Sequence, residues 1–140
     1  MNILALDLGA QLGLVVYNTD SQRVSFNATY SVSNVAEAGE LLGPLMRKLT
    51  FDVIVSSYPT RFYNTIVSHA KQMGVLEFIS YQLNKTVIYT NDATAKKAVF
   101  GKGKMSNEDI HYIFSSQGYH LDTPHEFDAL MFAKWFASAN

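Results

Sequence analysis

Hydrophobic residues follow a strand-like pattern at the start of the chain. Residues 2–7 and 12–17 are almost entirely apolar, and residues 23–30 alternate strictly between polar and apolar side chains. Short apolar runs and period-two alternation are typical of β-strands, and the glycine-containing and polar segments between them are typical of turns. The pattern therefore predicts three consecutive strands that form an antiparallel meander.

Helical and strand patterns alternate in the rest of the chain. Apolar residues at helical spacing predict helices over residues 35–49, 59–83, 94–99, from 106 onward and 124–138. Short β-branched runs predict strands over residues 52–57 and 86–89. Ser33-Asn34 and Ser106 are expected to cap helices, and Pro59 and Pro124 to open them. The order βββαβαβα predicts an α/β fold in which helices flank a five-stranded mixed sheet.

Composition narrows the class of protein. The chain has 140 residues, of which 48% are hydrophobic, so we expect residues 1–140 to form a single domain. A net charge of -1 excludes a uniformly basic protein and confines any contact with nucleic acid to a local patch. No apolar run reaches the roughly 20 residues of a membrane span, and no signal peptide is evident, so a soluble cytoplasmic protein is expected. The lack of cysteine excludes thiolate ligands and nucleophiles.

Three motifs contain residues suited to phosphodiester chemistry. The first expected strand ends in Asp7, which Leu8-Gly9 follows. The segment K-K-A-V-F-G-K-G-K over residues 96–104 follows the last expected strand. In H-E-F-D-A-L over residues 125–130, His125 and Asp128 are three positions apart and share one face of a helix. These motifs, in this order, resemble those of RuvC-type Holliday junction resolvases of the RNase H-like superfamily, including phage-encoded members.

The resemblance implies an RNase H-like fold and an enzyme, in the host cytoplasm if phage-encoded. Such an enzyme is a homodimer that hydrolyses the backbone of branched DNA, such as Holliday junctions, with Mg²⁺ or Mn²⁺. It also implies that Asp7, His125 and Asp128 are metal ligands and catalytic residues, and that Lys96 is catalytic. Carboxylate oxygens are the ligands that these hard cations prefer, which agrees with that assignment.

Basic residues form the expected DNA-binding surface. Those assigned to it are Lys96, Lys97, Lys102, Lys104 and Arg61. No acid interrupts the four lysines, and the glycines between them allow the backbone to approach phosphates. The surface could extend to Tyr63, His69 and Lys71. A solvated loop is the structural alternative for the lysine segment.

One residue departs from the family's pattern. The family's fourth strand ends in a glutamate that bridges two metals, whereas this chain has Ser57 there, or Ser56 if the register shifts. A hydroxyl is a poor substitute, so a single ion is easier to hold than two. Asp92 or Glu77 could replace the missing carboxylate, although both are more typical of surface residues. Asn107 is a second departure, near a position where the family often has lysine.

The candidate site residues also have purely structural explanations. Asp7 could form a turn, Asp128 could complement a helix dipole, and His125 could simply be exposed. The serine substitution keeps open a catalytically degenerate protein that binds branched DNA or a protein partner. A YqgF-like RNA nuclease would share the first and last motifs but not the lysine-glycine segment. An actin-like ATPase, which has a similar first turn, needs far more than 140 residues.

Overall fold

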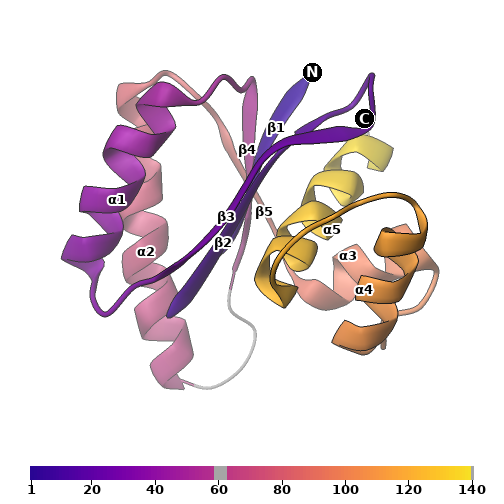
Figure 1. Ribbon diagram of the computed structural model, residues 1–140. Coiled ribbons are helices and arrows are strands. Elements are labelled where there is room, and N and C mark those ends of the chain that lie inside the picture. The colour runs from indigo at the N-terminus through magenta and orange to yellow at the C-terminus, as the bar shows by residue number, and fades with distance from the viewer. Residues whose placement is uncertain (59–62, 140) are drawn as a thin grey trace.

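The computed structural model describes residues 1–58 and 63–139, without the side chains of residues 63–65. The elements are β1 (Asn2–Asp7), β2 (Gln11–Asn18), β3 (Arg23–Ser31), α1 (Val35–Lys48), β4 (Val53–Ser57), α2 (Tyr63–Gln82), β5 (Val87–Thr90), α3 (Asp92–Phe100), α4 (Asn107–Ser116) and α5 (Pro124–Ala139) (Figure 1). This order confirms the predicted α/β pattern. The predicted helix start at Pro59, and Arg61, lie outside the described residues.

The strands form one five-stranded mixed sheet in the order β3-β2-β1-β4-β5. The first three strands pair antiparallel, which confirms the predicted meander. Strand β4 pairs parallel with β1, and β5 parallel with β4. Strands β1, β4 and β5 therefore end at the same edge of the sheet, where the side chains that follow them come together.

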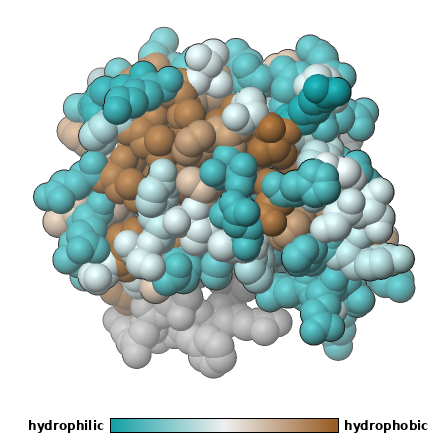
Figure 2. Space-filling view, in the orientation of Figure 1, coloured by the Kyte–Doolittle hydropathy of each residue, from teal (hydrophilic) through white to brown (hydrophobic). Residues whose placement is uncertain are grey.

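Helices cover both faces of the sheet. Figure 1 shows α1 and α2 on one face and α3, α4 and α5 on the other. Leu4 and Leu6 belong to the core beneath α1 and α2, whereas Ile3 and Ala5 belong to the core beneath α5. Figure 2 shows apolar residues gathered between α1 and the edge strand β3. By the same alternation, Asp7 falls on the side of the sheet that carries α5.

Side-chain caps determine where the helices begin. Asn34 accepts a hydrogen bond from the backbone N–H of Glu37, and Ser106 caps α4 in the same way, as the sequence predicted. Helix α3 begins at Asp92 rather than Thr94, because the side chain of Asn91 accepts from the N–H of Thr94. Among the described residues, no helix combines the length and the hydrophobicity that a transmembrane span requires.

Candidate functional site

The candidate site lies at the end of β1, between the sheet and the first turn of α5. Asp7 ends this central strand, and its side chain is only 16% exposed. His125 Nδ1 donates a hydrogen bond of 3.0 Å to Asp7 Oδ2, across 118 positions of the sequence. Helix α5 also carries Asp128, whose pKa is raised by burial and raised further by the charge of Asp7. The structure thus places His125 in contact with Asp7, and Asp128 lies one turn further along the same helix.

A glycine allows the close approach of α5 to the sheet. Asp7, Gly13 and Thr29 are register partners in a row across β1, β2 and β3. A Cβ atom on Gly13 would lie 2.6 Å from the backbone carbonyl carbon of His125. Only a residue without a side chain fits there, so Gly13 determines how near His125 comes to Asp7. Sequence analysis missed Gly13, since a glycine inside an apolar strand was the only signal.

The acidic groups of the site share a perturbed electrostatic environment. Burial raises the pKa of Asp7, and the hydrogen bond from His125 partly offsets that rise. Burial also raises the pKa of Asp128 to about 8, with further contributions from Asp7 and Asp92, while Lys96 opposes the rise. The pKa of His125 is raised, mainly by its hydrogen bond to Asp7. A cation among these carboxylates would favour their ionised forms.

The turn after Asp7 is held by side chains from β4 and α2. The Leu8 N–H donates to Ser57 Oγ at 3.0 Å, so the hydroxyl in the expected ligand position binds backbone instead. The Gly9 N–H donates to Gln72 Oε1 at 2.9 Å, and Gln72 Nε2 donates to the Gly9 carbonyl at 3.0 Å. His69 Nε2 contacts the Leu8 carbonyl oxygen. These contacts restrict the direction in which β1 presents Asp7.

Two of these residues change the sequence-based interpretation. His69 was expected on an extended DNA-binding surface, but its ring is partly buried against the turn. Helix α2 turns this position toward β1, so the ring supports the turn after Asp7, and the extension of the DNA-binding surface to His69 stays a prediction. Gln72, 4% exposed, was not selected as a functional residue. The available signal was a polar residue at a helical spacing from the apolar Leu76 and Ile79.

A buried carboxylate holds the start of α5 to the edge strand. Glu126 is 1% exposed and receives hydrogen bonds from Asn27 Nδ2 at 2.6 Å and Thr29 Oγ1 at 2.5 Å. Its own backbone N–H donates to Thr123 Oγ1 at 3.2 Å, which caps the helix. Glu126 therefore determines the position of the turn that carries His125. The sequence analysis missed this role, for which T-x-x-E at residues 123–126 was a signal.

The remaining predicted residues are distributed around the site. Lys96 is half-buried and interacts electrostatically with Asp128. The other lysines of the segment, all exposed, are Lys97, Lys102 and Lys104. Asp92 is exposed at the start of α3, yet its charge raises the pKa of both Asp7 and Asp128. Glu77 instead accepts a hydrogen bond from Tyr89 at 2.7 Å and is not among the groups that perturb the two aspartates.

The metal-ligating side chains at the site are of the type that a hard divalent cation prefers, but they are fewer than such a cation needs. Within residues 1–58 and 63–139, no group of three or more histidine or acidic side chains is arranged so that it could hold a metal ion. Asp7 and Asp128 supply carboxylate oxygens, but one oxygen of Asp7 is already bonded to His125. Ser57 Oγ, where a bridging carboxylate was sought, accepts from backbone. The side chains therefore fit a partly protein-ligated ion rather than a closed pair of metal sites.

Solved structures resemble the chain along nearly its whole length. The Thermus thermophilus RuvC structure has a TM-score of 0.77 and 17% identity, over 99% of this chain and 94% of that one. T. thermophilus RuvC in complex with a Holliday junction substrate has a TM-score of 0.84 and 16% identity over the same shares. The Fowlpox virus resolvase with Holliday junction DNA has a TM-score of 0.65 and 11% identity, over 99% of both chains.

Sequence comparisons add no relative to these structures. No protein-family model matches the chain, and no curated protein matches it by sequence. The resemblance therefore lies in the arrangement of the elements, which agrees with the sheet order and with the helices on both faces. The chain has the RNase H-like fold of the RuvC and poxvirus Holliday junction resolvases.

Proposed function

We propose that this protein is a divalent-cation-dependent endonuclease that hydrolyses the phosphodiester backbone of branched DNA, such as Holliday junctions. The observation that carries the proposal is the contact between Asp7 and His125 at the end of β1, with Asp128 on the same helix as His125 and the pKa of both carboxyl groups raised by burial. The fold shared with junction resolvases supports it. Buried acids that cost free energy to ionise are suited to binding a cation.

In this proposal, each residue at the site has a separate role. Asp7 and Asp128 would hold Mg²⁺ or Mn²⁺, which supplies an activated water and stabilises the leaving oxygen when bound. The hydrogen bond to Asp7 raises the pKa of His125, which favours its protonated form and suits it to donate a proton to the leaving oxygen. Lys96, beside Asp128, would orient a phosphate oxygen.

The lysine segment would bind the DNA backbone. Lys96 and Lys97 lie in α3, and Lys102 and Lys104 follow it; Lys96 interacts electrostatically with Asp128. If all four contact phosphates, the logarithm of the binding constant should fall with the logarithm of salt concentration with a slope of about -3.6. A homodimer would place two such sites on the strands of one junction.

A second candidate function is the binding of branched DNA without cleavage. Ser57 favours it, because the hydroxyl in the expected ligand position is bonded to the Leu8 N–H and adds no negative charge. The lack of a three-donor metal group among the described side chains also favours it. The two candidates share a fold and a substrate, so binding alone cannot separate them.

Cleavage of a synthetic four-way junction with Mg²⁺ or Mn²⁺ distinguishes these functions. For the nuclease, we expect cleavage that depends on the cation and is abolished by Asp7→Asn, with junction affinity retained. If the wild-type protein binds but does not cut while Ser57→Glu does, the non-cleaving function is correct. If the protein cuts folded RNA but not junction DNA, it is an RNA nuclease, and the DNA proposal is wrong.

A further inference from the structure

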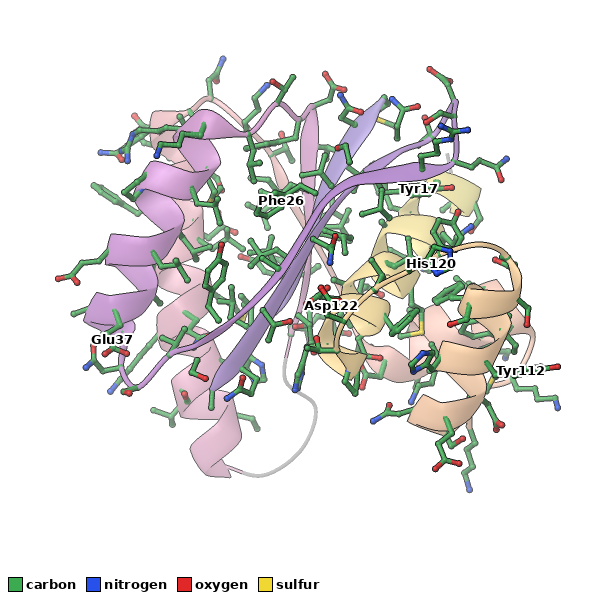
Figure 3. The ribbon with its side chains drawn as sticks, viewed as in Figure 1. Tyr17, Phe26, Glu37, Tyr112, His120 and Asp122 are labelled. Carbon is green, nitrogen blue, oxygen red and sulfur yellow. The ribbon has the colours of Figure 1, made fainter. Side chains whose placement is uncertain are left out.

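A basic hollow lies on the side of the sheet that carries α5. It has a volume of about 690 Å³ and is bounded by the β2–β3 turn, the start of β3, the α4–α5 loop and Lys134 of α5. Figure 2 shows mostly polar residues over the β2–β3 turn and the α4–α5 loop. In Figure 3, the labelled His120 lies at this hollow, Asp122 lies further along the loop toward the start of α5, and Tyr17 lies on the neighbouring strand β2.

The charge of this hollow differs from that of the chain as a whole. Its lining includes Arg23, His120 and Lys134, and no acidic side chain is among its described lining residues. The chain as a whole has a net charge of -1. Asp122 and Glu126 accept hydrogen bonds from Asn27 and do not line the hollow. The hollow therefore concentrates positive charge on an otherwise nearly neutral protein.

Aromatic rings hold the Lys134 ammonium group at the wall of the hollow. Lys134 Nζ lies 4.8 Å from the ring centroid of Tyr119, 5.3 Å from that of Tyr17 and 5.9 Å from that of Phe114. The Tyr119 hydroxyl donates to the backbone carbonyl of Gln22 at 2.8 Å, which links the two rims. Within the described part of the chain, no carboxylate lies within 4.0 Å of this ammonium. Its position is thus restricted while its charge remains available to an anion.

We infer that the basic hollow binds a phosphate group. The inference rests on the proposed function in one respect: the phosphate would belong to the backbone of a DNA arm that extends from the cleavage site. Asn27 both lines the hollow and donates to Glu126, the neighbour of His125, so the hollow begins beside the first turn of α5.

The length of β3 gives the expected distance between the phosphate bound in the hollow and the scissile phosphate at the candidate site. Arg23 begins this strand and Thr29 lies two residues before its other end, in register with Gly13 and thus with Asp7. Six residues of strand span roughly 20 Å. Since successive base pairs rise about 3.4 Å, the bound phosphate should lie about six base pairs from the scissile one. The hollow would therefore select for junction arms that are long enough to reach it.

One substitution and a matched control test the inference by DNA binding. Arg23→Gln removes an exposed positive charge from the hollow, whereas Lys48→Gln removes an exposed charge from the end of α1. The salt slope is the change in the logarithm of the binding constant with the logarithm of salt concentration. With junction arms of about 10 base pairs, Arg23→Gln should reduce the magnitude of this slope by about 0.9, whereas arms of about 4 base pairs should show no change. Lys48→Gln should leave both slopes unchanged. Equal slopes for Arg23→Gln and Lys48→Gln on the long arms would overturn the DNA assignment.

A second measurement uses inorganic phosphate as the probe and needs no DNA. In ¹H–¹⁵N spectra, phosphate should shift the amide resonances of Gly118, Tyr119 and His120, and Arg23→Gln should weaken that binding severalfold. If phosphate shifts these resonances but no junction binds, the hollow is a phosphate site and the proposed function is wrong. If junctions are bound and cut while neither phosphate nor Arg23→Gln has any effect, the inference fails and the proposed function stands.

Discussion

Replacement of Gly13 by alanine tests how closely α5 must approach the sheet. The new Cβ atom would lie 2.6 Å from the carbonyl carbon of His125 and 2.7 Å from its Cβ and carbonyl oxygen. Ordinary contacts begin at 3.4 Å, so the first turn of α5 must move away by roughly 0.8 Å. Overpacking of this kind typically costs about 1–3 kcal/mol. The melting temperature should therefore fall by roughly 4–12 °C.

The same displacement should affect cleavage more than binding. It would separate His125 from Asp7, to which it now donates at 3.0 Å. A misplacement of about 1 Å at a reacting centre can reduce kcat by about 100-fold. Under the proposed function, we therefore expect Gly13→Ala to cut a junction about 100-fold more slowly, with Kd for the junction within about twofold of wild type, in single-turnover and equilibrium-binding assays.

Gly74→Ala is the matched control. A Cβ atom on Gly74, in the middle of α2, meets no atom within 4 Å, so this change should raise stability by about 1 kcal/mol. Calorimetric melting of Gly13→Ala and Gly74→Ala measures the difference in their stability without any assumption about activity. The packing argument would be refuted if Gly13→Ala melted within about 1 °C of wild type.

Three further predictions concern charge and buried hydrogen bonds. The pKa of Asp128 is raised to about 8 in the folded protein, so the folded state binds the extra proton and the free energy of unfolding should fall as pH rises from 4 to 8. Urea titrations without metal should show a shallower fall for Asp128→Asn, and equal slopes would contradict the assignment. Glu126→Gln replaces one carboxylate oxygen with an NH₂ group, which would face either the Thr29 hydroxyl or the Asn27 amide NH₂, both of which now donate to Glu126. The change should lower the free energy of unfolding by about 1–3 kcal/mol in the same titrations, whereas no loss would show that the carboxylate is not needed. Gln72→Ala should cost about 1–3 kcal/mol by leaving the turn after Asp7 unpaired, whereas Gln82→Ala, exposed on the same helix, should cost less than about 0.5 kcal/mol.

The fold was largely predictable because its elements have clear periodic patterns. Leu4 and Leu6 alternate with Ile3 and Ala5, and the two sets cover opposite faces of the sheet. Strand residues point alternately to the two faces, so this pattern predicts both strands and layers. The start of α3 was less predictable, because the cap at Asn91 adds a first turn before the apolar positions of that helix.

The candidate site was predictable only in part. Asp7, His125 and Asp128 belong to short motifs that can be read locally, and the structure places His125 in contact with Asp7. Glu126 was not predictable as a buried residue, since its partner Thr29 lies 97 positions away in sequence. The role of Gly13 was not predictable for the same reason, because the atoms that exclude a side chain at this position belong to α5. Long-range packing partners of this kind leave little trace in a single sequence.

The contact between Asp7 and His125 has a consequence for how the protein is made. The ribosome synthesises β1 first, and at about 5–20 residues per second the helix that completes the centre follows only after roughly 6–24 s. Until residues 124–139 have emerged, the nascent chain has neither His125 nor Asp128. A prematurely terminated product would therefore lack this centre, and under the proposed function it would be unable to cut DNA.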